Sequence, residues 1–509
     1  MLMWFYTAIV LVIVLLIKKI FENYKLRKVL SKLPGPKTNN VLLGNLPILL
    51  GRRKGISFHV ALSESLTGLS TIFREDGLYR FWVSVEPFVF LYSPESVEPV
   101  FSSHSLIDKG YSYSLLHCWL GTGLLTSSGD KWKTRRKMIT PTFHYRILDQ
   151  FIPIFDKNSK IFVTNLKEYL DKEWIDVTHL VNLCTLDIIS ETAMGIEMKS
   201  QNKNKGYYLN ALHEFCDIFM VRCVKPWLYS DFIFSCTSDG KKIKEVISIL
   251  HDFTSKILKQ RKEELKKEKT CEKNCSEICE DKRKEPLLNT LIKYQFENCN
   301  FTDKDICEEL DTFLFEGHDT TSVGICWVLY YLGLYPDIQQ KVYEELLQIF
   351  GGDKDRPITT QDIKDMKYLE CVLKESQRLS PSVPTITRSC TEDIKINGYT
   401  VPRGTTLNLL IYALHRDSKS FRNPEIFDPD RFLPENCIGR HPFAFCPFSA
   451  GSRNCIGQKY ALIELKAVIS RVIMNYRITS IDPPDKITCN FLLVLRPMEG
   501  FRLKIRPRE

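Results

Sequence analysis

The sequence has no long basic tract with interleaved aromatic residues, and its net charge of +9 is modest for 509 residues. Nucleic acid is therefore not an expected partner, whereas a mildly basic surface suits an acidic protein or anionic lipid headgroups. The 17 cysteines lack the regular spacing of a disulfide scaffold, which favours a reducing compartment. No internal repeat is present, and 44% hydrophobic and 11% aromatic residues indicate a folded globular protein.

The first 17 residues (MLMWFYTAIVLVIVLLI) contain no charge, and as a helix they would span roughly 25 Å, near the lower limit for a bilayer core. A cleaved signal peptide is the main alternative. However, no charge precedes the apolar run, no small-x-small cleavage site is present, and basic residues follow, which favours an uncleaved anchor with its C-terminal side in the cytosol. We expect an anchor over 1–17, a basic and proline-rich hinge over 18–36, and one large domain over 37–509.

The stretch FSAGSRNCIG contains a candidate metal ligand, Cys455. A thiolate is a strong, soft ligand for iron. Gly451 and Gly457 suit a backbone that turns tightly and approaches a flat ligand closely, and Arg453 can carry a guanidinium to a carboxylate. Burial as an ordinary cysteine is the alternative for Cys455, but the full spacing, which begins at Phe448, favours a ligand loop.

A long buried helix is predicted from Thr302 to about residue 335. Thr302 and Asp305 fit a helix-start signal, and Pro336 gives a stop. Inside the apolar pattern lies a polar patch, EGHDTT over 316–321, which is costly to bury unless it is paired or functional. A satisfied core network is the alternative. Thr320 follows Glu316 by four residues, so both can face the same pocket.

Three further patterns place charged residues at helical spacing. Trp132 and Arg136 share one face of a helix that Ser128 or Asp130 could cap; a solvated basic face is the alternative. A second buried helix is predicted over 360–379 and carries the i, i+3 pair Glu375 and Arg378. Such pairs are usually weak surface contacts, but with a second arginine they could form a buried cluster. The remaining candidates are Arg431, in PDRF, and Arg388, after two prolines.

The strand signals are few. Asn397-Gly398 between short alternating runs predicts a hairpin over 394–401, and strands are expected over 491–495 and 501–505. The aromatic stretch over 211–234 suits core packing or contact with a bilayer. The charged stretch over 256–284 contains Cys271, Cys275 and Cys279, but a structural zinc site needs four ligands, so a solvated linker is expected. The fold class is therefore mainly α with a small β region.

Five of these motifs, in this order along the chain, resemble those of the cytochromes P-450: the hinge, Trp-x-x-x-Arg, the Gly-x-Asp-Thr helix, Glu-x-x-Arg, and Phe-x-x-Gly-x-Arg-x-Cys-x-Gly. The resemblance implies a haem-thiolate monooxygenase with haem b held by Cys455. It also implies that Asp319 and Thr320 relay protons, that Gly317 thins the helix over the haem, and that a Glu-Arg-Arg cluster fixes the haem-loop side of the core. The residues expected to contact haem or its propionates are Trp132, Arg136, Arg388, Phe448, Gly451, Arg453 and Gly457.

The run ELDTFLFEGHDTTS over 309–322 resembles family four, whose better-known members hydroxylate fatty acids near the chain end. In several of them the glutamate that matches Glu316 is esterified to haem. The resemblance implies an endoplasmic reticulum membrane protein that receives electrons from an NADPH-dependent flavin reductase, with cytochrome b5 as a further partner. Alternatives are terpenoid, hormone or foreign substrates, or a haem protein that binds apolar ligands without turnover. The segments expected to face the substrate are 111–125, 211–234, 315–316, 383–386 and 492–493.

Overall fold

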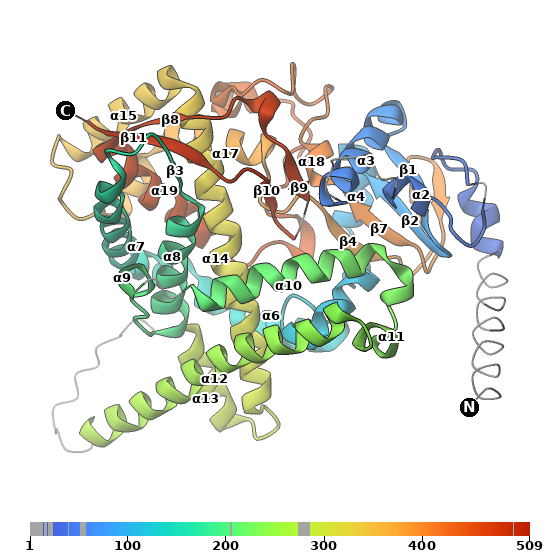
Figure 1. Ribbon diagram of the computed structural model, residues 1–509, viewed down its shortest axis with the longest axis horizontal. Helices are drawn as coiled ribbons and strands as arrows, with labels where there is room; N and C mark the ends of the chain where they lie inside the picture. The colour runs from blue at the N-terminus through green and yellow to red at the C-terminus, as the bar shows by residue number, and fades with distance from the viewer. Residues whose placement is uncertain are drawn as a thin grey trace.

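The computed structural model describes residues 14, 18, 24–38, 40–50, 58–203, 206–272, 286–491 and 493–508. Helices make up most of the molecule. One larger sheet, which combines strands from the N-terminal and C-terminal parts of the sequence, lies at the right of Figure 1. This confirms the predicted class, mainly α with a small β region. Within the part of the chain that the structure describes, no helix is both long enough and apolar enough to cross a membrane. The predicted anchor over 1–17 lies outside the described residues except for Val14.

The helices vary greatly in length. The longer ones are α3 (Phe58–Ile72), α6 (Gly129–Ile139), α7 (Tyr145–Leu166), α8 (Thr178–Ile189), α10 (Tyr207–Val224), α12 (Ser238–Glu272), α13 (Leu287–Glu297), α14 (Asp303–Leu334), α15 (Pro336–Phe350), α17 (Lys367–Leu379) and α19 (Gln458–Asn475). The shorter ones are α2 (Leu46–Leu50), α4 (Pro94–Phe101), α5 (His117–Leu120), α9 (Ser200–Lys203), α11 (Asp231–Ser235), α16 (Thr360–Asp365) and α18 (Ile411–Leu414).

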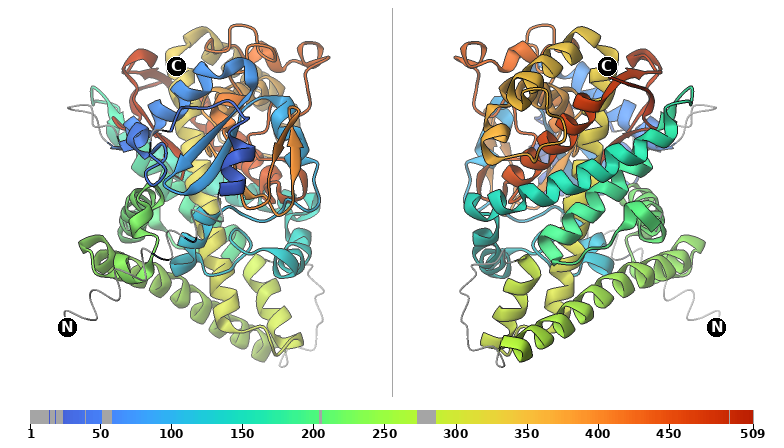
Figure 2. Two further views of the ribbon diagram at one scale, coloured as in Figure 1. Left: turned by 90° about the vertical axis from the view of Figure 1, so that its right-hand side faces the viewer. Right: turned by 90° about the vertical axis from the view of Figure 1, so that its left-hand side faces the viewer.

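Helix α14 passes through the middle of the molecule (Figures 1 and 2) and positions the site. It begins where predicted, because Thr302 and Asp305 form a capping box: the Thr302 hydroxyl accepts from the Asp305 N–H (3.3 Å), and the Asp305 carboxylate accepts from the Thr302 N–H (2.9 Å). It ends before Pro336, which starts α15. Most of its residues are buried on all sides, so packing rather than one amphipathic face holds it in place.

The larger sheet has the strand order β1 (Leu78–Val83), β2 (Glu86–Leu91), β7 (Thr406–Leu409) and β4 (Ile386–Ser389). Strands β2 and β7 pair in parallel, with Phe88 opposite Thr406. The other strands form small antiparallel sheets. These strands are β3 (Ile175–Asp176), β8 (Tyr476–Ser480) and β11 (Arg502–Pro507) in one sheet, β5 (Ile394–Ile396) with β6 (Tyr399–Val401), and β9 (Cys489–Phe491) with β10 (Leu495–Pro497). The predicted hairpin is confirmed, because Asn397 and Gly398 take φ values of 49° and 81° between β5 and β6.

Two predicted elements are wrong in their bounds. The helix expected over 360–379 is broken at Met366 (φ −70°, ψ 72°) into α16 and α17. The break is stable because the Glu345 carboxylate of α15 accepts from the N–H groups of Tyr368 (2.6 Å) and Leu369 (2.9 Å) in the first turn of α17. The strand expected over 491–495 instead spans the end of β9, the connecting turn and the start of β10, since Phe491 pairs with Leu495.

The expected cap of α6 is also only partly as predicted. Ser128 occupies the N-cap position, but its side chain makes no capping hydrogen bond, and Asp130 lies within the first turn. Of the cysteine-rich stretch, Cys271 belongs to the end of α12, whereas Cys275 and Cys279 lie outside the described residues. The described residues contain no group of three or more His, Cys, Asp and Glu side chains that could hold a metal ion.

Candidate active site

A cavity of about 410 Å³ lies against α14, and Cys455 opens into it. All five segments predicted to face the substrate contribute to its walls: 111–125, 211–234, 315–316, 383–386 and 492–493. The last contributes through Leu493, and Leu492 lies outside the described residues. A further wall was not foreseen from the sequence. It comes from α2, α3, β1 and β2, through Leu49, Leu62, Leu66, Phe81, Val83, Phe88 and Phe90. No local pattern marks these residues, because only the folded sheet brings them to the cavity.

The loop before α19 holds Cys455 at the cavity surface. The Cys455 N–H donates to the Phe448 carbonyl (2.9 Å), and the Asn454 N–H donates to the Gly451 carbonyl (3.1 Å), which closes a tight turn. Gly451 has φ +70°, and a Cβ there would collide with the Phe101 carbonyl oxygen, so the position requires glycine. Gly457 has an ordinary φ of −88°, and a Cβ there would be in ordinary van der Waals contact with Cys455 Sγ, at 3.9 Å. The protein itself therefore does not require glycine at this position, and the missing side chain matters only for a ligand in the cavity.

The three arginines predicted to contact propionates lie at one edge of the cavity, and each of them donates hydrogen bonds to other groups of the protein. Arg453 stacks over the Trp132 ring (4.3 Å) and donates to the Ile107 and Leu124 carbonyls (2.8 and 3.2 Å). Arg136 donates to the Asn454 carbonyl and side-chain oxygen (2.9 and 2.7 Å), directly before Cys455. Arg388 is buried behind the lining and contacts the Ser449 hydroxyl (3.4 Å).

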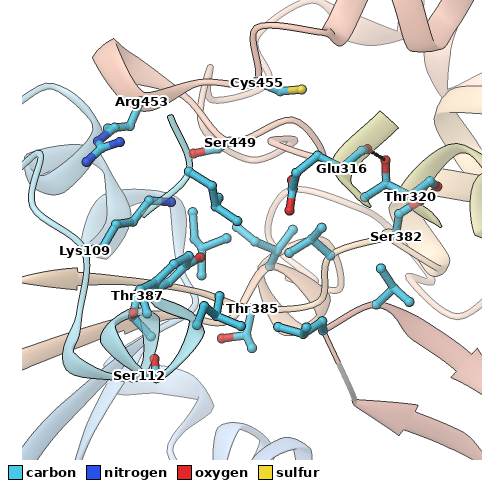
Figure 3. Close-up of a pocket in the computed structure, with 18 of the residues that line it drawn as sticks. Lys109, Ser112, Glu316, Thr320, Ser382, Thr385, Thr387, Ser449, Arg453 and Cys455 are labelled. Carbon is cyan, nitrogen blue, oxygen red and sulfur yellow. Dashed lines mark hydrogen bonds between the residues drawn. The ribbon is translucent and has the colours of Figure 1, made fainter. Parts of the chain in front are cut away.

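Lys109 is a site residue that the sequence analysis missed, since no motif or periodicity marks it. It lines the cavity beside Arg453 (Figure 3), with its Nζ 4.3 Å from the Tyr113 ring centre. Burial holds the pKa of Lys109 well below its usual range, and the charges of Arg388 and Arg453 lower it further. Burial and Arg388 likewise lower the pKa of Arg453 to about 9. These cations repel one another, and none makes a salt bridge in the described part of the chain, so the edge suits a ligand with carboxylates.

On the facing wall, Glu316 and Thr320 both line the cavity, as their spacing predicts. The Thr320 hydroxyl donates to the Glu316 carbonyl (2.8 Å; Figure 3). Burial raises the pKa of the Glu316 carboxyl to about 7. Gly317 is needed for packing, because a Cβ there would lie 2.6 Å from Ile189 of α8.

Asp319 does not belong to the cavity lining. It is 1% exposed and forms an ion pair with Arg496 of β10. Arg496 also lies 3.0 Å from the Nε2 of His213 in α10. Burial lowers the pKa of His213 to about 4, so the imidazole is neutral and can accept this hydrogen bond. The structure thus places Thr320 at the cavity and Asp319 one residue away, on the side of the helix that faces β10.

Glu375 and Arg378 form an ion pair in which both side chains are fully buried. Arg378 Nε and Nη2 each lie 2.7 Å from the carboxylate, and Arg431 Nε approaches the same carboxylate at 3.5 Å. The cluster connects to the cysteine loop through His415, which the sequence analysis did not single out. The His415 carbonyl accepts from Arg378 (3.1 Å), and its Nε2 accepts from the Cys446 N–H (2.9 Å). Burial lowers the pKa of His415 to about 3, which keeps Nε2 an acceptor.

The site fits haem. Cys455 offers a free thiol at the cavity surface, the adjoining cations suit carboxylates such as propionates, and the remaining lining is mostly apolar. This combination suits a haem held through a cysteine thiolate.

Comparison with known proteins identifies the family. Residues 34–505 match the family model described as cytochrome P450. The chain belongs to this family and is a cytochrome P450 monooxygenase with a haem iron cofactor. It is 43% identical to cytochrome P450 4c3 of Drosophila melanogaster over 95% of this chain and 91% of that protein. It is 42% identical to cytochrome P450 4V2 of Homo sapiens over 86% of this chain and 83% of that protein. It is 39% identical to cytochrome P450 4c21 of Blattella germanica over 96% of each chain.

Proposed function

We propose that this monooxygenase hydroxylates a fatty acid or a related lipid near the end of its apolar chain. The observation that carries the proposal is the largely apolar cavity of about 410 Å³ with Cys455 at its surface, which suits a flexible hydrocarbon chain. The similarity to family-four members across most of the chain supports it.

Each site residue has a proposed part. When bound, haem supplies the activation of oxygen and the oxidation of the C–H bond. Cys455 contributes the thiolate ligand. Phe448 lines the cavity and its carbonyl accepts from the Cys455 N–H, Gly451 lets the loop pass the Phe101 carbonyl, and Gly457 leaves space on the cavity side. Trp132, Arg136, Arg388 and Arg453, together with Lys109, hold the propionates. Thr320 holds a proton at its Oγ1, and Asp319, the preceding residue of α14, relays the proton that replaces it. The Glu375, Arg378 and Arg431 cluster fixes the loop from behind.

A covalent ester between Glu316 and a haem methyl group is part of the proposal. Glu316 supports it because its carboxyl points into the cavity (Figure 3) and makes no salt bridge within the part of the chain that the structure describes. Haem of the wild type should then resist extraction by acidic solvent, and haem of Glu316→Ala should be extractable. Complete extraction from the wild type would rule out the ester.

The membrane setting and the partners follow from the same proposal. We place residues 1–17 as an anchor in the endoplasmic reticulum membrane, 18–36 as a hinge, and 37–509 as the catalytic domain in the cytosol. Electrons come from an NADPH-dependent flavin reductase, with cytochrome b5 as a second donor. Exposed apolar side chains support contact with lipid next to the cavity: Trp227 (52% exposed), Phe232 (79%) and Ile233 (48%) lie on the stretch between α10 and α12, close to Tyr229 of the lining.

The deciding experiment is mass-spectrometric. The membrane protein is incubated with its reductase, NADPH and a medium-chain saturated fatty acid, and the position of any added hydroxyl is determined, with Cys455→Ala as the inactive control. A hydroxyl at the terminal carbon supports the proposal. If a protein with a normal carbon-monoxide spectrum gives no product, the fatty-acid proposal fails, and terpenoids, hormones and foreign compounds are tested next.

A further inference from the structure

Ser382 makes a contact with α14 that none of the motifs above explains. It lines the cavity, and its hydroxyl donates to the main-chain carbonyl of Thr320 (2.9 Å); Figure 3 shows the two residues side by side. Because Thr320 lies inside α14, its carbonyl also belongs to the helical hydrogen bond toward Gly324.

The main chain of Ser382 extends the contact to the β9–β10 hairpin. The Ser382 carbonyl accepts from the Leu495 N–H (2.9 Å), and the Leu495 carbonyl accepts from the Trp327 indole N–H (2.9 Å), which returns to α14. The next residue of β10, Arg496, pairs with Asp319. Three segments far apart in the sequence thus meet at Ser382 and hold both Asp319 and Thr320.

The same segments also form cavity walls. Val383 and Thr385 follow Ser382 and line the cavity, and so do Phe491 and Leu493 of the hairpin. A substrate that rests on these walls is therefore held in one frame with the Thr320 hydroxyl. Misplacement of a reacting group by about 1 Å can cost roughly 100-fold in rate. A single hydrogen bond that fixes the Thr320 hydroxyl relative to these walls can therefore affect the rate strongly.

We propose that Ser382 is a positioning residue of the monooxygenase reaction, whose hydroxyl fixes Thr320 against the walls that carry the substrate. The proposal rests on the proton-handling role proposed for Thr320, and it does not depend on which apolar substrate is taken.

Amide hydrogen exchange tests the contact without turnover. Peptides covering residues 317–326 are compared by mass spectrometry in the wild type, Ser382→Ala and Ser382→Thr. Ser382→Ala should exchange about three- to tenfold faster, the factor expected for one lost hydrogen bond, whereas Ser382→Thr keeps the hydroxyl and should stay near the wild type. Ser112→Ala is the matched control, because Ser112 lines the same cavity from another segment of the chain; it should leave exchange over residues 317–326 unchanged.

Coupling tests the function. In Ser382→Ala the peroxide released per NADPH consumed should rise several-fold with little change in KM, and Ser382→Thr should restore the wild-type ratio. Peroxide can be measured with any substrate, so this test remains valid if the fatty-acid proposal is wrong. If Ser382→Ala folds poorly, Ser382→Cys, a weaker donor of similar size, should show the same changes to a lesser degree.

Three results would overturn the proposal. They are unchanged exchange, faster exchange with unchanged coupling, and failure of Ser382→Thr to restore coupling. Thr320→Ala separates this proposal from the proposed role of Thr320: if that variant leaves coupling unchanged, the proton-handling role itself is wrong, while Ser382→Ala would still speed amide exchange over residues 317–326.

Discussion

Replacing Glu375 with Gln should destabilise the protein strongly. The Glu375 carboxylate is fully buried and accepts from Arg378 Nε and Nη2 (2.7 Å each) and from the Asp428 N–H (2.9 Å). A glutamine keeps one oxygen but turns an NH2 group toward the guanidinium, which leaves a buried charge unpaired. Breaking a buried pair in this way costs about 3–5 kcal/mol, a large part of the roughly 5–15 kcal/mol of a typical native state.

The cost can be measured as a thermal midpoint. For a domain of this length the unfolding entropy is about 1 kcal/mol per kelvin, so Glu375→Gln should lower the midpoint of haem-band loss by about 3–5 °C. Glu425→Gln is the matched control. Glu425 lies between Pro424 and Ile426, whose carbonyls accept from Arg378, but its side chain is 70% exposed and pairs with Arg416 at 3.1 Å. Arg416 is 14% exposed, but the Glu425 carboxylate is in water, which can replace it beside the guanidinium. The pair should therefore contribute about 0–1 kcal/mol, and the midpoint should move by about 1 °C or less.

The outcome also reports the charge state of Glu375. Burial raises the pKa of its carboxyl, while Arg378 lowers it. If Glu375 were already protonated in the native state, glutamine would mimic it, and the two variants would melt together within about 1 °C of the wild type. That result would refute the argument that the cluster is a charged pair.

Three further predictions concern the site and its support. Cys455→Ala should lose the long-wavelength absorption band of the reduced, carbon-monoxide-bound protein; a variant that keeps the band would contradict the ligand assignment. Gly451→Ala should cost more than the roughly 1–3 kcal/mol of left-handed strain, because its Cβ would also collide with the Phe101 carbonyl; Gly404→Ala, with φ +87° and open space, isolates the strain in a parallel melt. Burial raises the pKa of Glu309 to about 7, so the native state binds this proton more tightly than the unfolded state, and stability should fall as pH rises from about 4.5 to 7. In Glu309→Gln, whose side chain can still accept from the Leu124 N–H, the unfolding midpoint should decrease less between these pH values. If the midpoint decreases as much as in the wild type, other groups cause the pH dependence.

Local signals predicted the elements that depend on local chemistry. The capping box at Thr302 and the stop at Pro336 set the ends of α14, and Asn397-Gly398 set the β5–β6 hairpin. The break at Met366 was not predictable, because the Glu345 carboxylate that stabilises the new helix start comes from another helix. The turn between β9 and β10 was missed, and one strand was predicted over 491–495, because the hairpin depends on the pairing of Phe491 with Leu495 rather than on a turn motif.

The candidate site divides in the same way. Spacing correctly put Glu316 and Thr320 on one cavity and Glu375 beside Arg378. It could not show that Asp319 faces Arg496, because that partner lies 177 residues away in the sequence. Lys109 was missed because only the fold brings it near Arg453.

The parallel pairing of β2 with β7 has a consequence for biosynthesis. Phe88 and Phe90, which form part of the cavity wall, belong to a strand whose partner residues, Thr406 and Asn408, are translated about 300 residues later. At about 5–20 residues per second, the ribosome needs roughly 15–60 s to reach them. During that time one edge of β2 has no native strand to pair with, which is a typical hazard for aggregation. We therefore expect this edge of β2 to stay open to pairing with other chains until the last fifth of the sequence is translated.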